Sequence, residues 1–173
     1  MSEALAARRS TGGLSPAGAA RLIALLLPIA LLGGALGSQY FGGLHPCEMC
    51  YWQRWPHGAA ILLAALAFTA PAESGRSRSL TLLAALAIAV SGAIGVYHAG
   101  VEAKIFEGFT QCTATGKGLS AADLLKQITQ APLVRCDEVQ FRFLGISRAG
   151  WNAILSLGGA ALILILNLRS KRA

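Results

Sequence analysis

The chain has 173 residues, of which 54% are hydrophobic and only 13% are charged, and its mean hydropathy is +0.55. Because an ordinary soluble domain carries about 25% charged residues, this composition excludes a typical soluble protein and predicts a single membrane domain. The net charge of +7 could indicate a nucleic-acid partner. The basic residues are grouped beside apolar runs, however, so we expect no nucleic acid.

Four long runs without a charged residue indicate the predicted membrane spans. Each is close to the ~20 residues that a helix needs to cross a hydrocarbon core of about 30 Å. The sequence therefore predicts an all-α fold, an antiparallel four-transmembrane-helix bundle that occupies residues 1–173. In chain order, the predicted segments are a tail at 1–21, a span at 22–41, a loop at 42–50, a span at 51–72, a loop at 73–78, a span at 79–101, a long loop at 102–148, a span at 149–168 and a tail at 169–173.

The distribution of basic residues predicts which side of the membrane each connection occupies. Eight of the fifteen Lys and Arg residues fall in segments 1–21, 73–78 and 169–173, together with only two acidic residues. Lys and Arg are in excess in the cytoplasmic loops of membrane proteins. We therefore expect a multi-pass membrane protein with both termini in the cytoplasm and with loops 42–50 and 102–148 on the outer side, which in a bacterium is the periplasm.

The long loop 102–148 is predicted to carry a short helix. Ser120 is a typical N-cap residue, and Pro132 would end the helix. Apolar residues recur between them at helical spacing, at Leu124, Leu125 and Ile128. The pattern is amphipathic, so the helix either lies on the membrane surface or packs on the bundle.

All four cysteines lie in the predicted periplasmic loops, where disulfides persist because the compartment is oxidising. Cys47 and Cys50 form a Cys-x-x-Cys pair at a predicted helix start. A purely structural disulfide there would contribute only about 1.9 kcal/mol and would be strained by its short span, so we expect a redox pair. A bridge between Cys112 and Cys136 would contribute about 3.5 kcal/mol. It is equally compatible with a structural staple and with an exchanging disulfide.

Zinc binding is the other common use of a Cys-x-x-Cys pair. The gap between Cys112 and Cys136 supplies no second pair at this spacing, and no two histidines lie at zinc-finger spacing. We therefore expect no metal site.

Arg54 and His98 are the candidate binding residues of the spans. Arg54 follows Cys50 by one helical turn, and a charged residue in a membrane helix by default indicates function. The alternative is an interfacial anchor whose head reaches the lipid headgroups. His98 lies at a similar depth near the outer end of the third span, either as a ligand-binding or as an interfacial residue.

Together these residues resemble the bacterial disulfide bond formation protein B family (DsbB), the quinone-coupled thiol oxidases of the inner membrane. The resemblance covers the chain from about Leu22 to Leu168. Its motifs are Pro46-Cys47-x-x-Cys50-x-x-x-Arg54, Tyr97-His98 and the sequence from Cys136 to Gly145. Some family members carry an acidic residue where Gln53 stands and have no proline at position 56.

The resemblance implies a quinone-dependent protein thiol:disulfide oxidoreductase with the disulfides Cys47–Cys50 and Cys112–Cys136. A periplasmic thioredoxin-like oxidase (DsbA) would attack Cys112, and Cys136 would then exchange with Cys47. The electrons would pass to ubiquinone or menaquinone. The implied catalytic residues are Cys47, Cys50, Cys112 and Cys136, and the implied quinone-binding residues are Cys50, Arg54 and His98.

Two alternative functions remain open at this point. A related disulfide oxidase with a dedicated partner, of the vitamin K epoxide reductase type, has four spans and quinone chemistry, but usually carries its Cys-x-x-Cys in a late span. A non-enzymatic membrane protein could use both disulfides as staples. Trapping of free thiols would separate a staple from a shuttle, because a staple stays oxidised whereas a shuttle shows mixed redox states.

Overall fold

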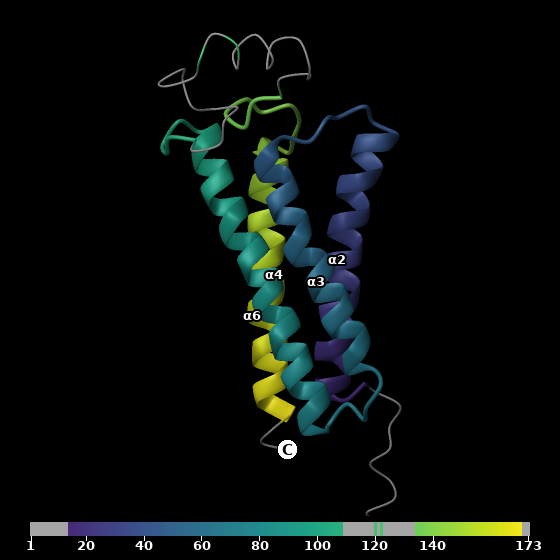
Figure 1. Cartoon of the computed structure of the whole chain (residues 1–173). Helices are drawn as coiled ribbons and strands as arrows, with labels where there is room; N and C mark the ends of the chain where they lie inside the picture. Colours follow the sequence, from purple (N-terminus) through teal and green to yellow (C-terminus); the bar gives the residue numbers. More distant parts are fainter. Residues whose placement is uncertain (1–13, 109–119, 121, 123–133, 171–173) are drawn as a thin grey trace, which may run out of the picture.

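The computed structural model of the protein describes residues 14–108, 120, 122 and 134–170. Within them, four long helices pack side by side in an elongated bundle, and consecutive helices run in opposite directions (Figure 1). The antiparallel arrangement of the four predicted helices is therefore observed. Cys112 and the predicted amphipathic helix, apart from Ser120 and Ala122, lie outside the described residues. The helices are α2 (Pro16–Tyr40), α3 (Glu48–Ala67), α4 (Gly75–Glu102) and α6 (Arg148–Ser170).

Side chains cap the starts of the first three helices. Ser15 and Ser74 each accept a hydrogen bond from the backbone N–H three residues later, at 3.1 and 3.2 Å. Cys47 does the same at the start of α3, where its sulfur lies 3.4 Å from the Cys50 nitrogen. Such caps satisfy one of the backbone donors that every helix leaves unpaired at its start. The first cysteine of the Cys-x-x-Cys pair is thus also a structural part of α3.

The helix ends differ from the predicted spans. α2 begins before residue 22, at Pro16, and α3 ends at Ala67 rather than near residue 72. α4 begins at Gly75, so Arg76 and Arg78 of the predicted loop belong to a helix. The length of an apolar run is set by the part of the helix that contacts lipid, whereas the start of a helix is set by where a capping residue stands. The two boundaries need not coincide.

The distribution of side chains is that of a membrane protein. Three of the described helices, α2, α4 and α6, are long and apolar enough to cross a membrane. The bundle buries mainly alanine, while many large apolar side chains are exposed. This arrangement is expected in lipid, where small residues let helices approach closely and Leu faces the hydrocarbon. The core residues are Ala20, Ala24, Ala60, Ala64, Ala84, Ala85, Ile88, Ala160 and Ile163.

A short hairpin that the sequence analysis did not predict precedes α6. Strand β1 (Arg142–Phe143) pairs antiparallel with β2 (Ile146–Ser147). The turn residues Leu144 and Gly145 have φ of 51° and 80°. Two positive φ angles are typical of the two-residue turns that match the twist of a hairpin. The Trp151 ring nitrogen donates to a β1 carbonyl at 3.0 Å and fixes the hairpin to α6.

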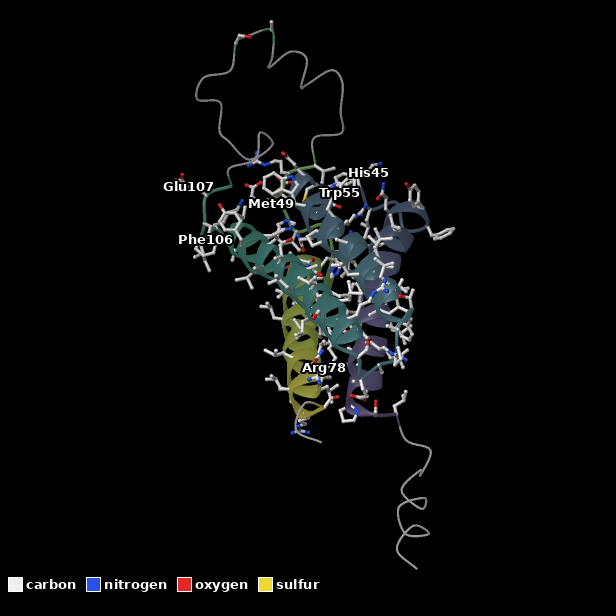
Figure 2. The ribbon with its side chains drawn as sticks, turned by 60° about the horizontal axis from the view of Figure 1, so that its bottom comes forward. His45, Met49, Trp55, Arg78, Phe106 and Glu107 are labelled. Atoms are coloured by element: carbon white, nitrogen blue, oxygen red, sulfur yellow. The ribbon has the colours of Figure 1, made fainter. Side chains whose placement is uncertain are left out.

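The two ends of the bundle differ in chemistry. Arg78 donates to the Asn167 carbonyl at 2.8 Å, so the start of α4 is joined to the end of α6. Figure 2 shows Arg78 far from His45 and Met49, which lie with the cysteine motif at the other end. The described basic residues of the predicted inner side therefore share one end of the molecule (Figure 1).

Small residues bring α4 and α6 into close contact. A Cβ atom added to Gly95 would lie 3.1 Å from both the Ala149 oxygen and the Ala153 nitrogen. These are backbone atoms of α6, which cannot move aside as the end of a flexible side chain can. The side-chain nitrogen of Asn152 would lie 3.2 Å away.

We predict that Gly95→Leu lowers the free energy of unfolding by about 1–3 kcal/mol, because overpacking forces α4 and α6 apart. Unfolding of the purified protein in detergent would measure this change. Gly33→Leu is the matched control, because no atom lies within 4 Å of a Cβ added there. Equal stability of the two variants would show that the α4–α6 contact is loose.

Candidate functional site

Three cysteines meet at the end of the bundle opposite Arg78. Cys47 and Cys50 come from the start of α3, and Cys136 comes from the segment that follows the long loop. Cys47 Sγ donates a hydrogen bond to Cys50 Sγ at 2.9 Å. The sulfurs of Cys47 and Cys136 and one ring nitrogen of His98 lie within 4.8 Å of one another, and all three residues are buried. A sulfur of one predicted pair therefore lies beside a sulfur of the other.

The surroundings of Cys47 determine which thiol of the Cys-x-x-Cys pair ionises more readily. Hydrogen bonds with Cys136 and Cys50, together with burial, raise the pKa of the Cys47 thiol above its ordinary value. The Cys47 thiol therefore stays protonated, and its S–H group donates a hydrogen bond to the Cys50 sulfur. Because a hydrogen bond to the charged form favours ionisation, Cys50 is the sulfur better suited to be a thiolate.

A charged hydrogen bond from Lys104 joins the segment that carries Cys136 to the end of α4, and Arg135 of the same segment donates to the same carboxylate. Asp137 accepts two hydrogen bonds from Arg135, at 2.9 and 2.8 Å, and one from Lys104 at 2.5 Å. The hydrogen bonds from Arg135 and then Lys104 hold the pKa of the Asp137 carboxyl well below its usual range. The carboxylate is therefore charged at neutral pH. We call its hydrogen bonds with Arg135 and Lys104 the clamp.

A chain of hydrogen bonds leads from the cysteines into the bundle. Gln53 Nε2 donates to the Met49 oxygen at 3.2 Å and lies 2.8 Å from His98 Nδ1, while Gln53 Oε1 accepts from Asn152 at 2.8 Å. Since the Met49 carbonyl can only accept, the amide nitrogen must face it, and His98 Nδ1 must accept too. A neutral His98 therefore carries its proton on Nε2, which lies 3.6 Å from Cys47 Sγ.

The same reasoning orients His57. Asn152 Nδ2 donates to the Ser91 carbonyl at 3.2 Å, so Asn152 Oδ1 is the acceptor that lies 2.9 Å from His57 Nε2. Ser91 Oγ donates its proton to the Gln53 carbonyl at 2.8 Å. It must therefore accept from His57 Nε2, 3.0 Å away. His57 thus carries its proton on Nε2, and a lone pair remains on Nδ1.

A cavity of about 420 Å³ adjoins this network. Its wall is formed by α2, α3 and α6, by the end of α4 and by residues around the hairpin. Cys50, Arg54 and His98, the three predicted quinone-binding residues, all line it. The volume lies within the range of about 300–1,000 Å³ that is usual for small-molecule sites.

Arg54 is held against α2. Its Nη1 donates to Gln39 Oε1 at 2.6 Å, and its Nη2 donates to the Ala35 carbonyl at 3.3 Å. The guanidinium also lies over the Tyr51 ring, 5.1 Å from its centroid. Arg54 Nε is buried and has no hydrogen-bond partner among the described residues. The cavity wall therefore holds a fixed cation whose Nε–H group is unused among the described residues.

Several residues of the site were not predicted from the sequence. Gln39 fixes Arg54, and Asn152 joins α3 to α6, but neither was singled out. Both are isolated polar residues at or within apolar runs, which is a signal of function or buried hydrogen bonding in a membrane helix. Since Cys112 is not described, its disulfide with Cys136 remains a prediction.

The cluster is chemically suited to two roles. Cys47, Cys136 and His98 offer the ligand types that zinc prefers, at distances compatible with one ion. Adjacent thiols of two pairs are also the arrangement that thiol–disulfide exchange requires, because one sulfur must attack another. Comparison with known proteins distinguishes the two roles.

The family profile described as Disulfide bond formation protein DsbB matches residues 18–166. Disulfide bond formation protein B of Methylococcus capsulatus is 34% identical over 153 residues, which cover 83% of this chain and 90% of that protein. The protein of the same name from Chromohalobacter salexigens is 32% identical, with coverage of 83% and 84%. An uncharacterized protein of Rickettsia prowazekii, RP370, is 24% identical, with 79% of each chain covered. No solved structure matches the chain at a comparable level of significance.

The family match covers most of the chain, including α3, the described cysteines, Arg54 and His98. It favours thiol exchange over metal binding for the cysteine cluster. The chain therefore belongs to the DsbB family and is a disulfide-bond-forming membrane protein with a thiol–disulfide oxidase role.

Proposed function

We propose that the protein is an inner-membrane oxidase that reoxidises a soluble periplasmic thioredoxin-like partner of the DsbA type and passes the electrons to membrane quinone. The observation that carries the proposal is the position of Cys136 beside Cys47, with Cys50 on the wall of the adjoining cavity. The Cys-x-x-Cys pair thus lies between the second cysteine pair and a cavity in which a ligand dissolved in the membrane could bind.

The proposed exchange conserves disulfide bonds. A partner thiolate attacks Cys112, forms a mixed disulfide and breaks the Cys112–Cys136 bond. Cys136 then attacks Cys47, which breaks the Cys47–Cys50 bond and releases Cys50 as a thiolate. The His98 Nε2–H group, 3.6 Å from Cys47 Sγ, is placed to donate to sulfur as charge moves through the cluster.

The cavity residues fit a quinone. A bound quinone would take up two electrons and two protons and become a quinol, while two thiols become a disulfide. The unused Arg54 Nε–H group suits a carbonyl oxygen, and the fixed charge of Arg54 would stabilise both a Cys50 thiolate and negative charge on that oxygen. Cys50, Arg54 and His98 would hold the ligand, which we propose is ubiquinone or menaquinone.

The same proposal requires four spans, with α3 crossing the membrane beside the three longer apolar helices. Both termini and the α3–α4 connection would lie in the cytoplasm, and the cysteine end would lie in the periplasm. The basic residues at the Arg78 end of the bundle support this orientation, since Lys and Arg are enriched in cytoplasmic loops.

We predict that a single cysteine reports this orientation in a background whose four native cysteines are replaced by serine. Glu107→Cys, at the exposed cysteine end, should react with a membrane-impermeant maleimide in intact cells. Arg76→Cys, exposed at the other end, should react only after the membrane is permeabilised. Labelling yields from the two sites measure the topology, and the reverse order of reactivity would exclude the proposal.

We predict that a Cys50→Ala, Cys112→Ala double variant accumulates an intramolecular Cys47–Cys136 disulfide in most molecules. The two sulfurs are already adjacent, so their effective concentration is far above that of thiols on separate molecules. Mass spectrometry of peptides cut without reduction would measure the bond.

The clamp supplies the control for this experiment. Adding Asp137→Ala removes the acceptor of Arg135 and Lys104, and should slow formation of the bond several-fold. Glu138→Ala should have less effect, because the Glu138 side chain is 69% exposed and its carboxylate lies 3.6 Å from Arg135 Nε, farther than the Asp137 carboxylate. If the double variant stays reduced under air while its sulfurs remain reactive, the proposed exchange between the two pairs is wrong.

We predict that Arg54→Met raises the KM for quinone by about ten- to a hundredfold, because a hydrogen bond to a charged group contributes about 1.5–3 kcal/mol. Steady-state oxidation of a reduced thioredoxin-like partner with a soluble quinone would measure KM. Arg54→Lys keeps the charge but loses the fork of donors to Gln39 and Ala35, so it should be intermediate. Arg76→Met, at the other end of the bundle, is the control. If Arg54→Met has the wild-type KM and turnover, Arg54 does not bind the quinone and only anchors the helix at the headgroups.

A further inference from the structure

Several residues that line the cavity carry a buried polar atom without a partner among the described residues. Among the described residues, four buried side-chain polar atoms have no hydrogen bond, and three of them belong to residues that line the cavity: Arg54 Nε, His57 Nδ1 and Glu102 Oε2. Leaving a buried polar group unsatisfied costs about 1–3 kcal/mol, so such a cluster indicates a place where a ligand completes the hydrogen bonding.

We propose that His57 is a ligand-binding residue whose Nδ1 accepts a hydrogen bond from a hydroxyl group of the quinol, the reduced form of the ligand. This inference rests on the proposed use of a quinone and adds a selectivity for its reduced form. His57 is only 3% exposed and lines the cavity, so a ligand there would meet it away from solvent.

The proton on His57 decides what the ring can bind. Ser91 Oγ and Asn152 Oδ1 both take the Nε2–H group, which leaves a lone pair on Nδ1. A lone pair needs a donor. The two carbonyl oxygens of a quinone can only accept, whereas the two hydroxyl groups of a quinol can donate. His57 therefore distinguishes the product of the reaction from its substrate.

The neighbouring Arg54 supplies the complementary group. Arg54 and His57 are three residues apart on α3, so they project from one face of the helix with about 5–6 Å between their Cβ atoms. Both line the same cavity. A six-membered ring with oxygens at opposite positions can thus place one oxygen at the Arg54 donor and direct the other to the His57 acceptor.

The assignment is consistent with the balance of the reaction. Two thiols lose two electrons and two protons as their disulfide forms, and the quinone gains both and becomes a quinol. His57 neither gains nor loses a proton in this scheme. It gains a hydrogen bond only after the oxygen facing it has become a hydroxyl group.

The test compares the binding of a short-chain benzoquinone and of its quinol to full-length protein in detergent. A Cys50→Ala background prevents electron exchange, and isothermal titration calorimetry measures each Kd. His57→Phe should weaken quinol binding by about three- to tenfold, because one net hydrogen bond is lost, and should change quinone binding less than about twofold. His45→Phe, which is exposed and does not line the cavity, should change neither.

A second measurement leaves residue 57 intact. In protein labelled with ¹⁵N-histidine, the Nδ1 resonance of His57, assigned by its loss in His57→Phe, should shift on addition of quinol and not of quinone. Equal weakening of both ligands by His57→Phe, or an unchanged Nδ1 resonance, would overturn the inference while leaving quinone binding in place. Failure of the protein with His57 to bind either ligand would instead refute the proposed function, and this inference with it.

Discussion

The hydrogen bond between Gln53 and Asn152 is the interaction on which the site depends. Inside an apolar bundle an amide has few possible partners, and an unmet one is costly, so the 2.8 Å contact fixes α3 against α6. Its direction is set at both ends by backbone carbonyls that can only accept. The two oriented amides in turn determine which ring nitrogen of each neighbouring histidine carries the proton. As a result His98 offers a donor to sulfur, and His57, which lines the cavity, offers a lone pair.

This polar contact relies on close packing. Gly95 lets α6 approach α4 so nearly that an added Cβ would lie 3.2 Å from the Asn152 amide nitrogen. The same closeness brings Asn152 within reach of the Ser91 carbonyl on α4. A small residue in the membrane therefore does more than stabilise a helix pair here, because it also places the amide that orients the histidines.

The sequence predicted the order of the helices, the basic end, and the similar depth of Cys50, Arg54 and His98. These features can be predicted because the distance of a charged residue, cysteine or histidine from the end of an apolar run gives its depth in the span. The sequence did not predict Gln39 as the partner of Arg54, or the Asn152 network. Partner choice depends on how each helix is rotated about its axis. In a soluble protein, amphipathicity encodes that rotation. In α2 and α6 the lipid face is as apolar as the core, so the signal is lost. The nearness of Cys136 to Cys47 followed only from the family resemblance, since their separation in sequence gives no distance.

The two halves of the cysteine cluster are held with different strength. Cys47 is anchored as the cap of α3 and lies beside the buried His98, whose ring Gln53 fixes. Cys136 is itself buried, but the clamp that positions it uses Arg135 and Lys104, which are 47% and 64% exposed. Exposed ion pairs contribute only about 0–1 kcal/mol each. The exchange proposed above would use this difference, because Cys136 would alternate between Cys112 and Cys47 while Cys47 stays beside the cavity. In that proposal the weak clamp would let the segment leave, and the buried network would give it a fixed position to return to.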